Sequence, residues 1–447
     1  MSQISTIKYS DIQEAHRFDA EYFKPEYLEI ERKLKNINSK YFGEFLIKIT
    51  GGATPLCAQY QKEGIPFLRV QNVMQNYFND DLVYISEKQN DNIKRSILKT
   101  DDVLLTITGT YGKSATVEKR YNNANINQHS VLMRFKENLN PYFISTFLNC
   151  KYGKKQSDKN VVGLSRPALD YNRIKKYFLI PDFPQSFQLQ IEKVVKSAHQ
   201  KQTQSKQLYK EAEQLLLEEL GLVGYTPKHK LTFQITKKEI DEVKRFDAEY
   251  FQPKYAEIIE KIEEYEGGFD VVENQFKQNK VLSKKDKEFY NYIEISDVNI
   301  SNGEIVTNKI ELKNIPVNGK RKLFKNDLLI SKVRPYRGAI SFIDFEKENL
   351  LGSGAFTVLQ EKTEYKKEVL MIFLKTVFIK ELLLRYNCGT SYPVIKDENI
   401  LNLKIPLIKP KIQKQIAEKI QESHKLRKES KELLEEAKRK VEEEIEK

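Results

Sequence analysis

Two segments of the sequence carry residue types found in nucleotide-binding or catalytic sites, and in both the spacing is incomplete. Gly112-Lys113-Ser114 matches the end of a phosphate-binding loop, but the first glycine of that loop belongs at position 107, which is isoleucine. Glu192 and Lys193 have the residue types of a nuclease metal site. They are adjacent and lie in a predicted helix, whereas such a site separates them by one residue on a strand.

The other candidates for chemistry are also incomplete. Asn140-Pro141-Tyr142 is a fragment of an amino-methyltransferase motif, without a glycine-rich methyl-donor loop beside it. The five histidines form no ligand pair at helical spacing and read as surface or capping residues. Cys57, Cys150 and Cys388 are too scattered for a zinc site or a disulfide framework. We therefore expect a binding protein that is not an enzyme, uses no cofactor and holds no metal.

Side chains that hydrogen-bond to nucleic acid are frequent in the predicted loops. Arg, Lys, Asn and Gln can read base edges with two hydrogen bonds, whereas Ser, Thr, Tyr and Lys hold phosphates. An ordinary surface turn is the alternative for each residue. The candidates for contact with double-stranded DNA are Arg69, Gln71, Thr108, Thr110, Tyr111, Lys113, Asn127, Gln128, Ser165, Arg166, Lys332, Arg334, Tyr336, Arg337, Ser353, Ser391 and Tyr392.

These loops fall at equivalent places of a long internal repeat. Residues 17–23 and 245–251 are both Arg-Phe-Asp-Ala-Glu-Tyr-Phe, 228 positions apart. Weaker matches follow at an offset of 225 or 226, for example between residues 102–106 and 327–331. The chain is therefore predicted to be a duplicated domain of about 225 residues, whose copies agree in their scaffold and differ in their loops.

The sequence of each copy predicts a short helix, then a strand-rich region interrupted by one helix, and finally a long polar helix. Pro184 and Pro410 stand where the long helices begin, and Gly221 stands where the first one ends. The predicted fold class is α+β. Shorter helices are predicted over residues 25–35, 141–149, 253–265 and 368–384, and strands over residues 65–73, 103–107 and 328–333. The predicted domains are residues 1–184, a spacer helix at 185–221, residues 222–409, and a second spacer helix at 410–447.

The long helices have apolar seams with polar centres, which allows two interpretations. Each helix could pack on its own domain, or the two could pair antiparallel as a coiled coil that separates the domains. In the second case about 35 residues span about 50 Å, more than one turn of DNA at about 34 Å. The expected pairing residues are Ile191, Val194, Ala198, Ser205, Leu208, Ala212 and Leu215 on the first helix, and Ile416, Ile420, Ser430, Leu434 and Ala437 on the second.

Composition and charge narrow the class of protein. The chain has 447 residues, is 40% apolar, and carries 75 basic and 63 acidic side chains, for a net charge of +12. Residues 186–220 are neutral overall and residues 411–447 carry +1, so about +11 lies on the strand-rich regions. A polyanionic partner would be held there. We expect no membrane span, no secretion signal and a cytoplasmic location.

Taken together, the repeated features resemble the specificity (S) subunit of type I restriction-modification systems. The resemblance is carried by the two Arg-Phe-Asp-Ala-Glu-Tyr-Phe motifs, Gly51-Gly52-Ala53-Thr54-Pro55, and the strands that follow Asp102 and Asp327. Ile180-Pro181 and Ile405-Pro406, each leading into a long helix, complete it. The second copy departs from the pattern because it lacks the Gly-Gly-Ala-Thr-Pro element.

The resemblance implies two target recognition domains, each reading one half of a bipartite asymmetric DNA site. It also implies that the paired helices dock two methyltransferase (modification) subunits, with restriction/translocase subunits in the full phage-defence complex. Two alternatives stay open at this point. One is a coiled-coil structural adaptor without DNA binding, and the other is the recognition part of an enzyme that acts alone.

Overall fold

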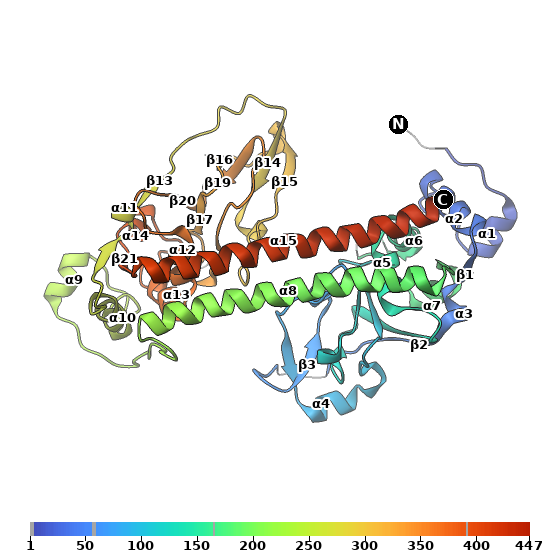
Figure 1. Ribbon diagram of the computed structural model, residues 1–447, viewed down its shortest axis with the longest axis horizontal. Helices are drawn as coiled ribbons and strands as arrows, with labels where there is room; N and C mark the ends of the chain where they lie inside the picture. Colours follow the sequence, from blue (N-terminus) through green and yellow to red (C-terminus); the bar gives the residue numbers. More distant parts are fainter. Residues whose placement is uncertain (1–3, 56–59, 164–165, 390–391) are drawn as a thin grey trace. The chain divides into compact units, whose positions relative to one another are not determined.

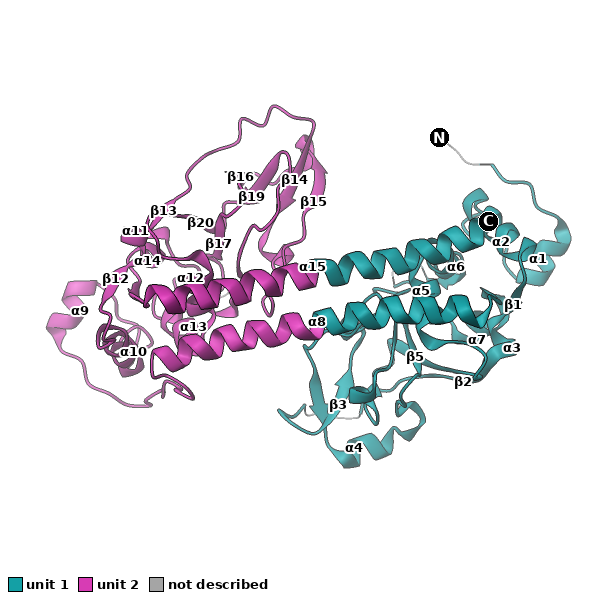
Figure 2. Ribbon diagram, viewed as in Figure 1, with its two compact units in different colours: residues 1–202, 428–447 teal, residues 203–427 magenta. Residues whose placement is uncertain are grey.

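The computed structural model describes residues 4–55, 60–163, 166–389 and 392–447. They form two compact units (Figure 2): residues 1–202 and 428–447 make up unit 1, and residues 203–427 make up unit 2. Helices α8 (Gln185–Glu219) and α15 (Pro410–Glu446), both labelled in Figure 1, each contribute residues to both units (Figure 2). Within the described residues, no helix is long and apolar enough to cross a membrane.

Unit 1 combines short helices with short strands, as the predicted α+β class requires. Besides its part of α8, its helices are α1 (Tyr9–Ala15), α2 (Pro25–Asn36), α3 (Phe42–Phe45), α4 (Glu87–Asn92), α5 (Pro141–Asn149), α6 (Lys151–Asn160) and α7 (Tyr171–Tyr177). Its strands are β1 (Ser39–Tyr41), β2 (Leu46–Gly51), β3 (Ile65–Leu68), β4 (Val83–Ile85), β5 (Val103–Thr106), β6 (Ser114–Thr116), β7 (Asn125–Ile126), β8 (Ser130–Phe135), β9 (Val161–Val162), β10 (Ala168–Leu169) and β11 (Leu179–Pro181).

Unit 2 repeats most of this order of elements and begins with the second part of α8. Its helices are α9 (Lys237–Val243), α10 (Pro253–Glu263), α11 (Val272–Gln275), α12 (Lys367–Lys375), α13 (Val377–Leu384), α14 (Asp397–Leu401) and the first part of α15. Its strands are β12 (Phe269–Val271), β13 (Phe276–Gln278), β14 (Phe289–Ile293), β15 (Asn308–Glu311), β16 (Gly319–Lys322), β17 (Leu328–Ser331), β18 (Ile340–Phe342), β19 (Leu350–Ser353), β20 (Phe356–Glu361) and β21 (Lys404–Pro406).

The sheets confirm the internal repeat. The strand order β2-β8-β5-β6 of unit 1 becomes β13-β20-β17-β18 in unit 2, and the antiparallel pair β1-β11 becomes β12-β21. The smaller sheet β4-β3-β7 corresponds to β15-β14-β19, to which unit 2 adds β16. In both smaller sheets the pairing of the middle strand with the later strand is parallel. Sequence identities that were sparse along the chain therefore mark the same topology twice.

The central sheet of each unit is buried on both faces. Along β5, Val103 and Leu105 pack with the helices, whereas Leu104 packs with the smaller sheet. In β17, Leu328 and Ile330 pack with the helices of unit 2, whereas Leu329 packs with the smaller sheet. Because successive side chains alternate between faces, a strand covered on both sides reads as an unbroken apolar run.

The two long helices, predicted from their flanking prolines, pair antiparallel within each unit. In unit 2, Ser205 and Ser423 are hydrogen-bonded and Lys419 forms an ion pair with Glu211. In unit 1, Ser430 Oγ donates to the carbonyl of Ala198 at 2.8 Å. The helices also complete each unit's apolar core, so packing on the domain and antiparallel pairing occur together.

The buried seam of α8 differs by one residue from the predicted one. Val195 and Leu216 are fully buried, whereas Val194, Leu208 and Leu215 are only half-buried. The buried positions follow a 4-3 spacing because α8 contacts both a partner helix and the body of its unit. The other proposed pairing residues are buried: Ile191, Ala198, Ser205, Ala212, Ile416, Ile420, Ser430, Leu434 and Ala437.

Two histidines, 225 positions apart, attach the long helices to the rest of each unit. In unit 1, His199 Nε2 lies 2.5 Å from the carbonyl oxygen of Asn76. In unit 2, His424 Nδ1 lies 2.8 Å from Asp344 Oδ2, and its ring stacks on Phe342. Burial lowers the pKa of His424. These two side chains are buried, which corrects their interpretation as surface or capping residues.

The helix predicted over residues 368–384 is two helices. Thr376 lies between α12 and α13 with an extended backbone, and Cys150 interrupts unit 1 at the equivalent place between α5 and α6. Helix α6 was not predicted. Its mean hydropathy is low, so nothing in its composition distinguishes it from a polar loop.

Candidate nucleic-acid interface

In unit 1, backbone hydrogen bonds bring the predicted loops together. The Asn127 amide donates to the Leu68 carbonyl at 3.2 Å, and the Ile107 amide donates to the His129 carbonyl at 2.9 Å. The Leu169 amide then donates to the Ile107 carbonyl at 2.8 Å. Residues near 69, 108, 128 and 166 therefore lie along one edge of the unit, although the sequence separates them by about 100 positions.

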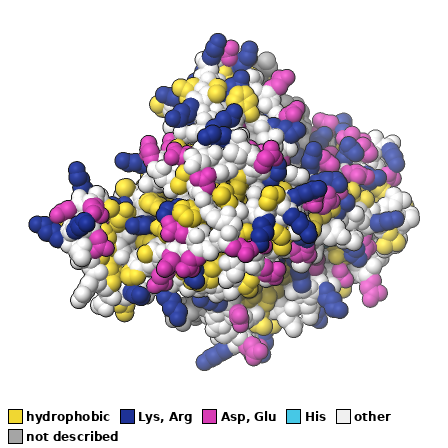
Figure 3. Space-filling view, turned by 60° about the vertical axis from the view of Figure 1, so that its left-hand side comes forward, with side chains coloured by type: hydrophobic (Ala, Val, Ile, Leu, Met, Phe, Trp, Pro, Cys, Tyr) yellow, Lys and Arg dark blue, Asp and Glu magenta, His cyan; other side chains and the backbone are white. Residues whose placement is uncertain are grey.

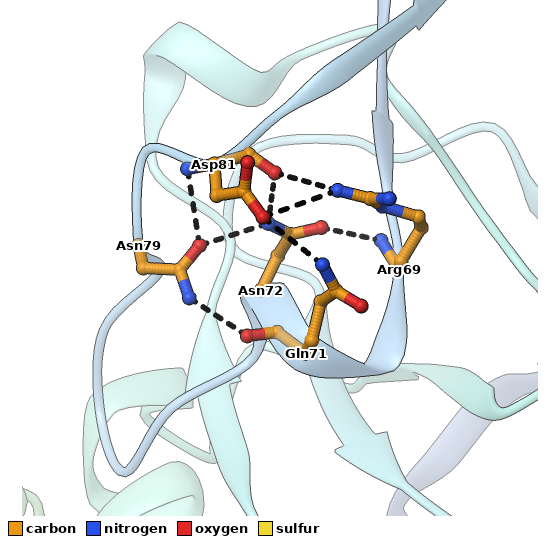
Figure 4. Close-up of polar contacts among 5 residues, drawn as sticks. All are labelled: Arg69, Gln71, Asn72, Asn79 and Asp81. Atoms are coloured by element: carbon orange, nitrogen blue, oxygen red, sulfur yellow. Dashed lines mark hydrogen bonds and ion pairs between the residues drawn. The ribbon is translucent and has the colours of Figure 1, made fainter. Parts of the chain in front are cut away.

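A polar network holds the turn after β3 (Figure 4). The side chains of Arg69 and Gln71 both donate to Asp81 Oδ2, at 3.3 and 3.0 Å. Asn72 is buried and donates to Asn79 Oδ1 at 2.8 Å. Arg69 is also mostly covered, with 23% of its side chain exposed. Two predicted base-reading residues are thus fixed by one carboxylate, which a DNA phosphate or base would have to replace.

The remaining candidates of unit 1 divide into exposed and engaged side chains. Thr110, Gln128 and Arg166 are exposed, and Thr108 pairs with Ala168 in a β-bridge. Tyr111 donates to Asp158 on α6 at 3.2 Å; burial and this carboxylate raise its pKa. Two candidates are more enclosed than expected: Lys113, whose pKa burial lowers, and Asn127, which is buried with its side chain accepting from the His129 amide.

Unit 2 builds the same edge from different side chains. The β-bridge between Val333 and Val394 stands where Thr108 and Ala168 pair in unit 1. Arg334 follows with a left-handed backbone (φ 48°), and its guanidinium lies 4.8 Å from the centroid of the exposed Tyr392 ring. Arg337 is exposed and Tyr336 is half-buried in the adjacent short helical turn. A cation stacked on an aromatic ring is a common element of nucleic-acid-binding surfaces.

Two candidates of unit 2 have structural roles. Lys332 Nζ lies 3.2 Å from Asp397 Oδ1, and Thr357 donates to the same oxygen at 2.6 Å. Ser353 is buried and accepts a hydrogen bond from the Ala355 amide. Ser165 and Ser391 lie outside the described residues.

Equivalent turns of the two units differ in charge. Glu294, Ser296 and Asp297 stand in unit 2 where unit 1 has Arg69, Gln71 and Asn72. Asp297 accepts from the Glu294 amide at 2.8 Å, just as Asn72 accepts from the Arg69 amide at the same distance. The frame is therefore kept, while the basic Arg69 is replaced by the acidic Glu294 and the neutral Asn72 by the acidic Asp297. Elsewhere, basic and acidic side chains are interspersed, as the face in Figure 3 shows.

Sequence reasoning missed several residues at the edge of unit 1. Thr54 donates to Gln128, and Arg95 donates to the Gly52 carbonyl at 3.2 Å. A Cβ at Gly52 would lie 2.3 Å from the carbonyl oxygens of Ile126 and Asn127, so only glycine fits there. The Gly-Gly-Ala-Thr-Pro element was therefore the available signal that this segment joins the loops.

Comparison with known protein families gives a match to part of the chain. Residues 269–439 match the family model described as "Type I restriction modification DNA specificity domain". This part of the chain is therefore similar to the DNA specificity domain family. The expected resemblance is thereby confirmed for unit 2, and the matched range contains Arg334, Arg337 and Tyr392. Unit 1 has the same strand order as this specificity domain.

The solved structures to which the chain is similar include the following two, both at low sequence identity. One is the type I restriction-modification S subunit from M. genitalium, with 13% identity over 91% of this chain and 96% of that chain and a TM-score of 0.43. Another is the HsdS subunit from Thermoanaerobacter tengcongensis, with 14% identity over 91% and 94% of the chains and a TM-score of 0.29. No curated protein matches the sequence.

Proposed function

We propose that the chain is the sequence-specificity subunit of a type I restriction-modification complex. Each unit reads one half of a bipartite, asymmetric site in double-stranded DNA through the edge that carries its loops. The chain catalyses no reaction itself and works in the cytoplasm. The proposed division is residues 1–184 and 222–409 for recognition, with 185–221 and 410–447 as helices that dock two methyltransferase (modification) subunits. Restriction/translocase subunits join in the full complex.

One observation carries this proposal: the two units repeat one framework with different polar groups on it. The turn of Arg69 and Gln71 offers donors, which suit the acceptors of guanine, whereas the exposed Glu294 offers acceptors, which suit the amino group of cytosine. Two units with the same loops would read the same half-site twice. Different groups on the same frame favour an asymmetric site.

The DNA-contacting residues that we propose are the exposed ones. Arg166, Gln128 and Thr110 serve unit 1, and Arg337 and Tyr392 serve unit 2. Arg69 and Gln71 join them if DNA displaces Asp81. Asn127 and Ser353 are buried and bonded within the protein, so we assign them to the frame.

The test is to map adenine methylation by sequencing DNA modified by the complex of this chain with its methyltransferase subunits. The wild type should methylate one bipartite sequence. Arg166→Ala should relax one half of it and Arg337→Ala the other, by about 1–3 kcal/mol at the affected base pair.

Lys325→Ala is the matched control, because Lys325 is an exposed cation of unit 2 away from the loops. It should leave both halves unchanged. Methylation without sequence preference, or a change in both halves from one substitution, would contradict the proposal. Duplex affinity that does not fall with salt would favour the adaptor alternative.

A further inference from the structure

The motif Arg-Phe-Asp-Ala-Glu-Tyr-Phe has the same local structure in both units. In each, a seven-residue helix, α1 or α9, precedes the motif. The residue after each helix, His16 or Lys244, has a left-handed backbone with φ of 51° and 52°. Residues other than glycine rarely adopt this conformation, and it occurs here twice at equivalent positions. The chain therefore enters the motif in the same direction in both units.

Most side chains of the motif have a role within their own unit. Arg17 and Asp19 pair through two hydrogen bonds, as do Arg245 and Asp247. The same aspartates accept from the amides of Tyr22 and Tyr250, at 3.1 Å in each case.

The tyrosine rings of the motif lie between cations. The guanidinium of Arg17 lies 5.2 Å from the centroid of Tyr22, and that of Arg245 lies 4.6 Å from Tyr250. A second cation, Lys159 or Arg385, contacts each ring at 4.4 and 4.7 Å. Lys159 and Arg385 are themselves repeat equivalents, 226 positions apart. These contacts fix the motif onto the unit.

The first phenylalanine of the motif has no such role. Phe18 is 84% exposed and Phe246 is 85% exposed. Single exposed apolar side chains are common on proteins. Here the same large aromatic side chain stands outside the same rigid motif in both units, where burial would otherwise favour a position inside.

The sequence segments that contain the two phenylalanines are acidic, although the chain as a whole is basic. Residues 11–21 contain four carboxylates and one arginine, and residues 239–249 contain five carboxylates, one lysine and one arginine. Each segment has a net charge of −3 in a chain of net charge +12. The arginine and the aspartate of each motif pair with each other, so the net charge of each segment comes from its other side chains. Such a surface repels a phosphate backbone and suits a basic protein surface.

We propose that Phe18 and Phe246 are two copies of one docking site, each inserting into an apolar, basic-rimmed pocket of the same partner protein. The loops that would contact DNA differ between the units, whereas this site is identical, so two copies of one protein fit it. The identity of that partner as the modification subunit rests on the proposed function. The docking site itself does not depend on the proposed function.

The experiment measures how many modification subunits the full-length chain binds, by native mass spectrometry, and how tightly, by calorimetry. The wild type should bind two. Phe18→Ala and Phe246→Ala should each weaken one site by about tenfold to a hundredfold, and the double variant should weaken both. Glu14→Lys and Glu242→Lys, at equivalent exposed positions, should each weaken one site about threefold or more and reduce its salt dependence.

Val317→Ala is the matched control, because Val317 is also 84% exposed but lies outside the motif. It should leave both sites unchanged. A double variant that binds two subunits within twofold of the wild-type affinity would overturn the inference. So would a loss of duplex DNA affinity by the chain alone with subunit binding unchanged. A wild-type chain that binds no modification subunit would instead count against the proposed function.

Discussion

Ser205 on α8 and Ser423 on α15 exchange hydrogen bonds in both directions. Each hydroxyl lies 2.7 Å from the backbone carbonyl oxygen of the other residue, and the two hydroxyl oxygens are 2.9 Å apart. In unit 1 the equivalent residues are Ser430 and Ala198, so only the bond from Ser430 remains. The two units therefore show the same helix contact with two serines in unit 2 and with one serine in unit 1.

That comparison predicts how substitutions in the pair behave. Ser423→Ala reproduces the arrangement of unit 1 and should lower the free energy of unfolding by only about 0.5–1.5 kcal/mol. Ser205→Leu should cost about 1–3 kcal/mol or more, because the site is fully packed. Urea denaturation followed by circular dichroism measures both. Equal losses for the two variants would show that the backbones do not approach as closely as these bonds require.

A second pair of equivalent residues differs in charge balance. Asp102 is buried and bonded to the Arg134 guanidinium at 2.6 and 2.7 Å. Asp327 is also buried, but Asn279 and Gln360 donate to it as neutral amides. Asp102→Asn leaves the partly exposed Arg134 guanidinium without its charge partner and should cost about 1.5–3 kcal/mol. Asp327→Asn should cost less than about 1.5 kcal/mol in the same unfolding measurement.

The pH dependence of Asp327 follows from its surroundings. Burial raises its pKa above the usual 3.8. The folded state therefore binds a proton more readily than the unfolded state. The contribution of Asp327 to stability should then improve as the pH falls from 7 towards 4. The difference in unfolding free energy between the wild type and Asp327→Asn should therefore increase as the pH is lowered across this range. A flat difference would indicate that the carboxyl is hydrated.

Lys375, at the end of α12, should destabilise the protein at neutral pH. Among the described residues its ammonium has no hydrogen-bond acceptor, and it lies 5.6 Å from the centroid of the Tyr209 ring. Burial lowers its pKa to about 7, helped by Arg427 and Lys380 and opposed by Glu213. The unfolded state, with a pKa of 10.5, binds the proton more tightly, so stability should rise between pH 7 and 10.5.

Lys375→Met removes this penalty. It should raise the free energy of unfolding at pH 7 by about 1 kcal/mol or more, and the gain should shrink at pH 10. Lys325→Met, at an exposed lysine, is the control and should have little effect at either pH. A gain from Lys375→Met that is independent of pH would mean that the ammonium is already solvated.

Asp81 should restrain DNA binding by unit 1. It holds the side chains of both Arg69 and Gln71. Asp81→Ala releases both side chains and removes a negative charge from the proposed interface, so non-specific affinity for duplex DNA should increase. The slope of log affinity against log salt should steepen by about one. Fluorescence anisotropy at several salt concentrations measures both quantities, and unchanged binding would place this turn outside the interface.

The framework could be predicted from the sequence because its signals are local. Pro184, Pro410 and Gly221 mark the ends of the long helices, and the repeated motif gives the duplication. The break at Thr376 escaped prediction because no glycine or proline marks it. The predicted seam of α8 contained Val194, whereas the buried residue is Val195. The prediction considered only the partner helix, but the body of the unit also decides which face of α8 is buried.

The state of the site residues could not be predicted, because it depends on partners distant in sequence. Arg69 is fixed by Asp81, Tyr111 by Asp158 and Lys332 by Asp397. Residue type alone marked all three as available for DNA. The turns after β5 and β17 lie at equivalent positions because they follow strands that the repeat aligns, whereas Ser353 lies in strand β19.

The division of the chain has a consequence for how it folds during synthesis. Unit 2 is one continuous stretch, whereas unit 1 needs residues 428–447. Leu434, Ala437, Val441 and Ile445 enter its core, and Glu442 and Glu446 bond to Lys151 and Tyr152. The ribosome reaches these residues only after it has completed unit 2. Although unit 1 begins to emerge first, it finishes folding last, and until then its unfilled core is a target for chaperones and proteases.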